Sequence, residues 1–299
     1  MKQRIITGVL FTLGVALFVV PGFWLAWLPI LLFTAVAVLS ARELVNALRN
    51  RGMKPNRPLA VAGSLLMLIP TLGSLLYPVN LLEASGPGLL ARLAGSFAVM
   101  AFVLLTVMIF SAIGLIIRRG PEALPDAIAT SAVMAYVAFP LACPALLLNN
   151  VRGGWLWLLV GLAAPWISDC FAYFTGSLIG RHSIVPDISP KKTLEGCLGG
   201  MVGSMLVLPL IFWLFGHTLG GQKHLSFGAL AFAVLSGLLL SVASQLGDWL
   251  ASGIKRWCGV KDFGHLLPGH GGIMDRFDSA FFTLPVTLVL AVLYQIIMI

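Results

Sequence analysis

Three aspartates in the last part of the chain have a spacing that suits a divalent cation. Asp275 and Asp278 are three residues apart, so both project from one face if a helix begins here. Asp248 follows a long apolar segment and is expected at the same depth. Converging carboxylates repel one another unless a cation lies between them, and Mg²⁺ prefers oxygen ligands. We therefore predict a metal site formed by Asp248, Asp275 and Asp278.

Cations, hydroxyls and glycines follow the first of these aspartates. In a helix that continues from it, Ser252 and Lys255 share its face at the i+4 and i+7 positions. Lys255 is followed by Arg256 and Lys261, which supply positive charge for phosphate groups. The segment 268–272, Pro-Gly-His-Gly-Gly, has too much glycine to be helical and lets backbone amides approach a ligand closely. Each feature alone has an ordinary explanation, as a helix cap or a surface charge, but their density favours phosphate chemistry.

A second polar segment lies nearer the middle of the chain. Residues 189–193 read Ser-Pro-Lys-Lys-Thr, a turn of hydroxyls and lysines that suits a triphosphate, although the spacing is not that of a Walker A loop. Asp169 lies in the apolar segment that precedes it. An aspartate at a helix end is often a cap, and a lysine pair in a loop often serves membrane topology. Both alternatives stay open for these residues.

A membrane scaffold must position these side chains. Of 299 residues, 59% are hydrophobic and 10% are charged, whereas soluble domains have about 25% charged residues. Long apolar segments recur, and backbone polar groups in lipid must be satisfied within helices. The sequence therefore predicts an all-α polytopic membrane protein. We expect about nine transmembrane helices, at residues 5–20, 22–41, 59–77, 89–117, 125–148, 155–176, 197–216, 226–247 and 279–298.

The distribution of basic residues predicts the orientation of these helices. Of the 19 lysines and arginines, only Arg92, Arg152 and Lys223 fall in segments that an N-in, C-out topology places outside. This asymmetry follows the positive-inside rule. The net charge of +8 therefore reports topology, and no nucleic acid partner is expected. The four cysteines are widely spaced and show neither a zinc nor a disulfide pattern.

The chain divides into two predicted parts without a linker. Residues 1–150 are expected to form an amino-terminal scaffold of transmembrane helices that faces lipid or a dimer partner. Residues 151–299 are expected to form the catalytic part, with two cytoplasmic motif loops. Small residues four apart begin the predicted helix 197–216, and this pattern favours close helix packing over contact with a substrate.

The second part resembles a known enzyme family. Residues 252–278 contain Ser-Gly-Ile-Lys-Arg, then Lys-Asp, Gly, Leu-Pro, His-Gly-Gly and Asp-Arg-Phe-Asp in order. This segment resembles the signature of the phosphatidate cytidylyltransferase (CDP-diacylglycerol synthase) family. Residues 189–196, and Asp169 with the Ala-Tyr-Phe at 172–174, resemble two further motifs of that family. The resemblance covers the spans from about residue 155 onward, whereas the first half matches only as membrane helices.

The resemblance implies that CTP and phosphatidate react to give CDP-diacylglycerol and pyrophosphate. It implies Mg²⁺ as cofactor and leaves a second, monovalent or divalent cation open. The implied catalytic residues are Lys255, Arg256, His270, Asp275, Arg276 and Asp278. The implied substrate-binding residues are Asp169, Ser189, Lys191, Lys192, Thr193, Glu195, Ser252, Lys261, Asp262, Gly271 and Gly272. The implied metal ligands are Asp248, Asp275 and Asp278. By family analogy we also expect membrane lipid as a partner, a homodimer, and a bacterial-type inner membrane with the active site on its cytoplasmic side.

Two alternatives stay open. Leu194 and Ala251 depart from the Trp and Glu that are common in the family, so the chain is alternatively a divergent paralogue that acts on another lipid phosphate or is inactive. A membrane transporter is a rival from another class, since charged residues inside membranes often mark ion pathways. The acidic residues here fall at the inner ends of predicted helices and not at their midplanes, which favours the enzyme.

Overall fold

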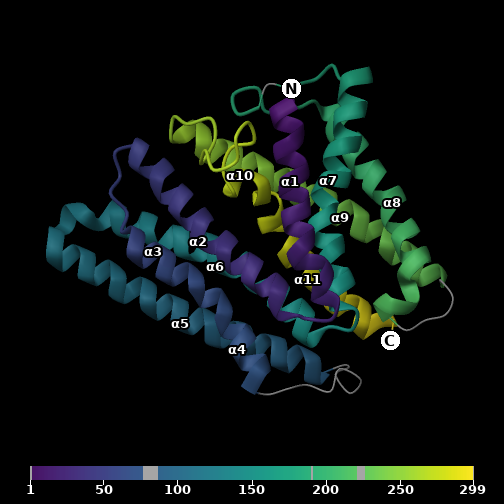
Figure 1. Ribbon diagram of the computed structural model, residues 1–299, viewed down its shortest axis with the longest axis horizontal. Helices are drawn as coiled ribbons and strands as arrows, with labels where there is room; N and C mark the ends of the chain where they lie inside the picture. Colours follow the sequence, from purple (N-terminus) through teal and green to yellow (C-terminus); the bar gives the residue numbers. More distant parts are fainter. Residues whose placement is uncertain (1, 77–86, 190, 221–225, 299) are drawn as a thin grey trace. The chain divides into compact units, whose positions relative to one another are not determined.

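The chain folds almost wholly into helices, as the sequence predicts. The computed structural model describes residues 2–76, 87–189, 191–220 and 226–298 (Figure 1). Within these ranges, β-structure is limited to two isolated bridges, Ser183 with Thr193 and Leu267 with Gly271. The all-α fold is therefore confirmed. Lys223, which the sequence places outside the membrane, lies outside the described residues.

Among the described residues, eight helical segments are long and apolar enough to cross a membrane, so the protein is a multi-pass membrane protein. The remaining predicted span, 59–77, falls on three shorter pieces: α3 (Arg57–Ser64), the 3₁₀ helix η2 (Leu65–Leu68) and α4 (Ile69–Leu76). Pro70 explains the change, because proline has no N–H to donate four residues back and its ring crowds that carbonyl. The count of about nine spans and their orientation stay predictions.

The helices form two compact units. The first contains Met1–Pro78, Ala91–Leu146 and Ile254–Phe277, and the second contains Val79–Leu90, Leu147–Gly253 and Asp278–Ile299. Three helices contribute residues to both units: α5 (Pro87–Arg119), α6 (Leu124–Asn150) and α9 (Phe227–Trp257). The proposed roles of residues 1–150 and 151–299 stay predictions.

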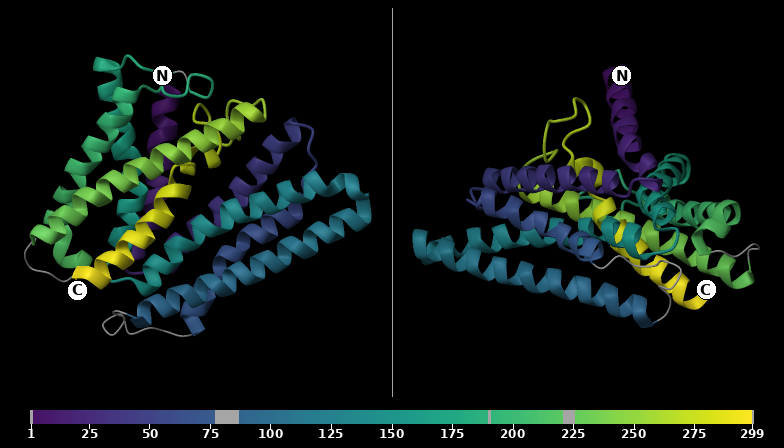
Figure 2. Two further views of the ribbon diagram at one scale, coloured as in Figure 1. Left: turned by 180° about the vertical axis from the view of Figure 1, so that it is seen from behind. Right: turned by 60° about the horizontal axis from the view of Figure 1, so that its bottom comes forward.

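The first unit is built around α5 and α6. Its elements are α1 (Lys2–Val19), η1 (Val20–Phe23), α2 (Trp27–Asn50), α3, η2, α4, most of α5 (Pro87–Arg119), η3 (Pro121–Ala123), most of α6 (Leu124–Asn150) and α10 (Met274–Phe277). Gly120 adopts a φ of 84°, which favours glycine, and turns the chain so that α5 and α6 lie side by side (Figure 2). Leu104 of α5 and Met134 of α6 form a buried cluster, against which Leu59 and Leu66 pack.

The second unit contains α7 (Gly154–Ile179), α8 (Leu194–Gly220), most of α9, and α11 (Ala280–Met298). Helices α7 and α8 lie against each other along their lengths (Figure 1). A Cβ at Gly196 would lie 2.9 Å from the carbonyl oxygen of Ala172, and side chains at Gly199 and Gly203 would overlap α7. The glycines of α8 therefore serve close packing, as their spacing predicts.

Candidate functional site

A cavity of about 410 Å³ in the second unit brings the middle polar segment together with α9. Its polar lining consists of Asp169, Tyr173, Ser177, Lys191, Lys192, Thr193, Gln245 and Asp248. The carboxylates come from α7 and α9, and the lysines come from the loop between α7 and α8. Five residues that the sequence singles out therefore share one cavity: Asp169, Lys191, Lys192, Thr193 and Asp248.

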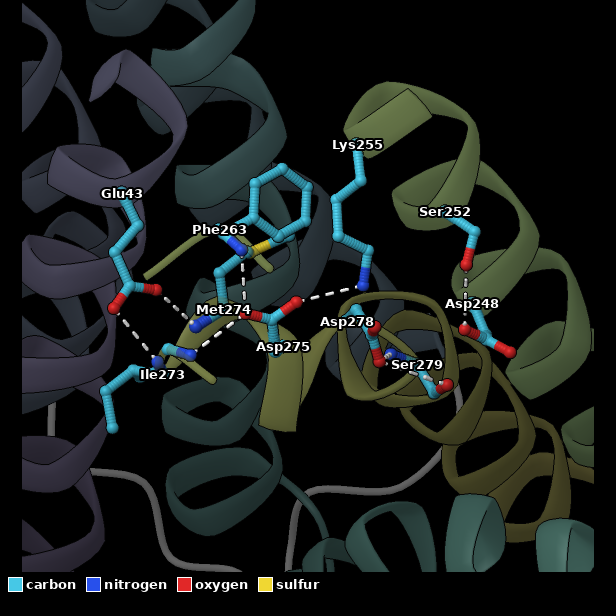
Figure 3. A network of polar contacts seen from close by, with 11 residues as sticks. Glu43, Asp248, Ser252, Lys255, Phe263, Ile273, Met274, Asp275, Asp278 and Ser279 are labelled. Carbon is cyan, nitrogen blue, oxygen red and sulfur yellow. Dashed lines mark hydrogen bonds and ion pairs between the residues drawn. The ribbon is translucent and has the colours of Figure 1, made fainter. Parts of the chain in front are cut away.

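Opposite charges meet inside this cavity. The ammonium group of Lys192 forms an ion pair with Asp248, and each side chain is about a quarter exposed. The hydroxyl of Ser252, one turn further along α9, donates a hydrogen bond of 3.3 Å to the other oxygen of Asp248 (Figure 3). Ser252 thus lies where the predicted helix places it. The cavity offers both a cation for a phosphate and carboxylate oxygens for a metal ion.

The loop between α7 and α8 is closed by Glu195, in the first turn of α8. One oxygen of this carboxylate accepts hydrogen bonds from the backbone N–H groups of Arg181 at 3.0 Å and His182 at 3.3 Å. The other oxygen lies 2.6 Å from Nδ1 of His182. The resemblance implies that Glu195 binds substrate, but in this structure its contacts fix the loop that carries Lys191 and Lys192. Sequence patterns alone did not single out His182.

Gln245 is a polar residue of the cavity that the sequence-based site omits. Its Nε2 donates to the carbonyl oxygen of Cys197 at 3.1 Å and to the hydroxyl of Ser241 at 3.2 Å. Its Oε1 is buried and has no hydrogen-bond partner in the described part of the chain. Buried polar atoms are normally satisfied, so this oxygen is an acceptor available to a ligand. The sequence signal for Gln245 was weak. It is a single polar residue three positions before Asp248, and its glycine and apolar neighbours are typical of a transmembrane helix.

In the first unit, Asp275 organises the loop between α9 and α10. Its side chain is 3% exposed, and Oδ1 accepts a 2.9 Å hydrogen bond from the Lys255 ammonium group (Figure 3). Oδ2 accepts from the backbone N–H of Phe263 at 2.8 Å and of Gly272 at 2.9 Å. The carboxylate therefore connects the end of α9 to the loop near its beginning, at Phe263, and near its end, at Gly272. Gly271 has a φ of 82°, and a Cβ there would lie 2.8 Å from this carboxylate.

Glu43 of α2 is a second organising carboxylate that the sequence-based site omits. Its two oxygens accept from the backbone N–H groups of Ile273 at 3.0 Å and Met274 at 2.8 Å (Figure 3). A Cβ at Gly264 or Gly272 would overlap the Glu43 carboxylate, which explains why glycine stands at both positions. The sequence offered one signal for Glu43, its position as an acidic residue two places after the predicted span 22–41. Charged residues at membrane depth are costly and usually functional.

The other predicted site residues differ in their exposure. Arg256, Lys261 and Arg276 are exposed, and Asp262 is partly exposed. His270 faces α1: a Cβ at Gly8 would lie 3.4 Å from its Nε2, and its Nδ1 is buried with no partner among the described residues. Ser189 is partly exposed in the second unit. These residues keep their predicted roles as hypotheses.

Asp278 belongs to the second unit and begins the turn before α11. The last helix does not continue through it: α10 ends at Phe277, and α11 begins at Ala280. Oδ1 of Asp278 accepts from the backbone N–H of Ser279 at 2.7 Å (Figure 3). A Cβ at Gly247 would lie 2.9 Å from the carbonyl oxygen of Asp278, so this glycine lets the turn approach α9 beside Asp248.

A magnesium ion fits the donor set of the cavity in the second unit. Mg²⁺ is usually held by one or two carboxylates together with substrate phosphates and water, and Asp169 and Asp248 line the cavity beside two lysines. Among the described residues, no three His, Cys, Asp or Glu side chains form a cluster ready for a metal ion. The three-aspartate site therefore stays a prediction.

Three of the four cysteines behave as small, buried apolar residues. All four are free thiols, and Cys143, Cys197 and Cys258 are buried. Burial raises the pKa of the Cys258 thiol, although the nearby Arg51 opposes that rise. A raised pKa keeps this thiol protonated and unreactive.

Comparison with known proteins identifies the family. The sequence pattern of the cytidylyltransferase family matches residues 2–294. The phosphatidate cytidylyltransferase of Staphylococcus aureus (strain COL) is 30% identical over 259 residues, which cover 86% of this chain and 87% of the relative. The phosphatidate cytidylyltransferase of Staphylococcus saprophyticus is 42% identical over 137 residues, or 46% of this chain and 49% of the relative. An uncharacterized protein of Escherichia coli K12, YnbB, is 40% identical over 163 residues, or 53% of this chain and 49% of the relative.

The extent of these matches differs between relatives. The chain spans about half the length of the S. saprophyticus and E. coli proteins, whereas the S. aureus protein is matched over most of its length. The family pattern covers nearly the whole chain, including both units and every candidate site residue. The chain therefore belongs to the cytidylyltransferase family.

Proposed function

We propose that this protein transfers the cytidylyl group of CTP to phosphatidate and releases pyrophosphate, giving CDP-diacylglycerol. The observation that carries the proposal is the cavity of the second unit, in which Asp169 and Asp248 face Lys191 and Lys192. A nucleoside triphosphate needs such a mixture, because its phosphates require cations while its metal ion requires carboxylates. Relatives named phosphatidate cytidylyltransferase support the choice of substrates.

The reaction requires little acid–base chemistry. The phosphate of phosphatidate is already an oxyanion, so one of its oxygens attacks the α-phosphorus of CTP directly. A new P–O bond forms as the bond to the β-phosphate oxygen breaks, and pyrophosphate leaves with the electron pair. Catalysis then depends on positioning the two phosphates and neutralising their charge.

The described contacts suggest roles for six of the polar residues that line the cavity. Lys192 exchanges Asp248 for a phosphate oxygen of CTP, and the hydroxyl of Thr193 and the ammonium group of Lys191 add donors to the same phosphates. Gln245 Oε1 accepts from a donor of the nucleoside, such as the cytosine amino group. Asp169 and Asp248 would hold Mg²⁺, which neutralises phosphate charge when bound.

Further predicted groups come from the end of α9, from the loop between α9 and α10 (residues 258–273, the signature loop) with α10, and from the turn before α11. We propose that Lys255 and Arg256 neutralise phosphate, with Arg276, His270 and Lys261 as further contacts. Asp275 and Asp278 are proposed to complete the binding of cations, including any second cation. The hydrogen bonds of Asp275 to Lys255 and to two loop amides support its placement in a preorganised loop.

We also propose a setting for the reaction. The distribution of basic residues supports a cytoplasmic active site in a bacterial-type inner membrane, with N-in, C-out topology. CTP would enter from the cytosol and phosphatidate from the bilayer. A homodimer is proposed by family analogy, and nucleic acid is not expected as a partner.

The test is the conversion of radiolabelled CTP into chloroform-soluble product by purified protein in detergent. Product should require both phosphatidate and Mg²⁺, and Asp248→Asn should abolish it. Asp187→Asn is the matched control, because Asp187 is an exposed carboxylate of the loop between α7 and α8 that does not line the cavity. Folded protein that forms no product from phosphatidate would refute the proposal, and other lipid phosphates would then be screened.

A further inference from the structure

A second hollow lies in the first unit, where the segment between α2 and α3 meets the end of α5. It has a volume of about 580 Å³, and four of its lining residues are cations: Arg49, Lys54, Arg57 and Arg119. None of the described residues that line it is acidic. The positive-inside rule explains why such residues occur on this side of a membrane, but it does not explain their arrangement around a cavity.

The backbone around this basic hollow is fixed by tertiary contacts. The Arg119 guanidinium donates to the carbonyl oxygen of Lys54 at 3.0 Å, and the backbone N–H of Lys54 donates to Asp126 at 2.6 Å. The Arg57 guanidinium donates to the side-chain oxygen of Asn46 at 2.7 Å. Of the four cations, only Arg119 has an acidic partner among the described residues, Asp126 at 3.7 Å. The other three cations line the hollow without an ion pair to a carboxylate in the described part of the chain.

An apolar groove continues from the basic hollow between α3 and α5. It has a volume of about 670 Å³ and shares Asn56, Pro58 and Arg119 with the hollow. Leu59 and Phe110 are among its apolar lining residues. The three cations without a described carboxylate partner lie at the end of an apolar groove. This arrangement suits an amphiphile whose anionic head group binds the cations and whose apolar chain fills the groove.

We propose that the hollow and groove together bind one anionic phospholipid, with its phosphate on the cations and an acyl chain between α3 and α5. The site belongs to the first unit and shares no residue with the Asp169 and Asp248 cavity of the second unit. A free phosphate would satisfy the cations but would leave the apolar groove unfilled, so the geometry favours the lipid. This proposal does not depend on the cytidylyltransferase activity.

The head-group contact is tested by native mass spectrometry of the full-length protein in detergent. The titrants are phosphatidylglycerol and phosphatidylcholine, neither of which is the proposed reaction substrate. We expect Arg49→Gln with Lys54→Gln to weaken phosphatidylglycerol binding about thirtyfold, because two cations are lost, and to leave phosphatidylcholine binding unchanged. Arg92→Gln with Arg152→Gln is the matched control, since it removes the same charge elsewhere. Unchanged phosphatidylglycerol binding in the first variant would overturn the proposal.

The acyl-chain contact is tested by filling the groove. Gly114 lines the groove, and a Cβ there would meet no atom within 4 Å, so a leucine side chain at this position can start into open space in the groove. Gly95→Leu is the matched control on the same helix, because its Cβ also meets no atom and Gly95 does not line the groove. We expect Gly114→Leu to lower phosphatidylglycerol binding at least tenfold and Gly95→Leu to leave it unchanged. Equal effects of the two leucines would overturn the acyl-chain placement.

Inorganic phosphate distinguishes the other source of the same head-group chemistry. We expect phosphate to compete only weakly with phosphatidylglycerol, because it gains nothing from the groove. If phosphate binds as tightly as the lipid, and Gly114→Leu does not affect its binding, the hollow takes a free anion and the lipid proposal is wrong. Should the charge variant fail to fold, the two leucine variants still decide the question, since leucine is a better helix former than glycine.

Discussion

Glu43→Gln tests whether a carboxylate on α2 holds the signature loop in place. The substitution keeps the shape of the side chain but replaces one acceptor oxygen by an NH₂ group. In the native protein the two oxygens accept from Ile273 N–H at 3.0 Å and Met274 N–H at 2.8 Å. Glutamine satisfies one of these N–H groups, and the other then faces a donor. The start of α10 would be held by one neutral hydrogen bond in place of two charge-assisted ones.

The size of the effect follows from those two hydrogen bonds. A hydrogen bond to a charged group contributes about 1.5–3 kcal/mol to stability. Losing one such bond should therefore lower the free energy of opening residues 272–275 by about 2 kcal/mol. Since 1.4 kcal/mol corresponds to a factor of ten, the amides of this segment should exchange about thirtyfold faster. Asp275 receives one of its hydrogen bonds from Gly272, so its orientation should loosen and kcat should fall more than KM rises.

The assay is hydrogen–deuterium exchange mass spectrometry of the purified variant, combined with cytidylyltransferase activity. Glu122→Gln is the matched control, because Glu122 is an exposed carboxylate of η3 in the same unit. Exchange in peptides that cover residues 272–275 should rise in Glu43→Gln and stay native in the control. Native exchange in Glu43→Gln would refute the reasoning, since it would mean that the two hydrogen bonds do not hold the loop.

Three further predictions concern other contacts. Asp275→Asn should abolish turnover without unfolding the protein, because Lys255 loses its charged partner; near-normal activity in a radiolabelled CTP assay would contradict this. Glu195→Gln should raise the KM for CTP more than it changes kcat, because the loop that carries Lys192 loses its charged tie, and an unchanged KM would remove that role. Gly203→Leu should lower the thermal midpoint by several degrees in a detergent melting assay, since overpacking against α7 costs about 1–3 kcal/mol; an unchanged midpoint would argue against the close packing.

The parts of the site that were predicted well depend on the spacing of residues within one helix. Ser252 lies one turn after Asp248 on α9 and contacts it, because helical periodicity alone brings i and i+4 together. The all-α membrane fold was equally accessible, since long apolar segments in lipid have few other solutions. The spacing of the glycines in α8 predicted close packing against α7, although it could not name the partner helix.

Contacts between distant segments were beyond the reach of sequence patterns. Nothing in the chain order indicates that Lys192 pairs with Asp248 or that Glu43 accepts from Ile273 and Met274, because tertiary packing alone brings these segments together. The division of the predicted span 59–77 into α3, η2 and α4 was not indicated by its apolar pattern, although Pro70 marks the place where the helix changes. The role of Glu195 in closing its own loop was hidden for the same reason, as the motif indicated a ligand contact and gave no geometry.

The hydrogen bonds of Glu43 to the loop amides can form only late in biosynthesis. Glu43 and Met274 are 231 residues apart in the chain, so the carboxylate is inserted long before its partners exist. At a synthesis rate of about 5–20 residues per second, the interval lasts roughly 10–50 seconds. During that time the nascent chain carries a carboxylate in α2 without its native donors, a state that favours water or other temporary partners. Maturation of the signature loop is therefore a late event in assembly, and a chain stopped before residue 273 lacks both backbone donors of the Glu43 carboxylate.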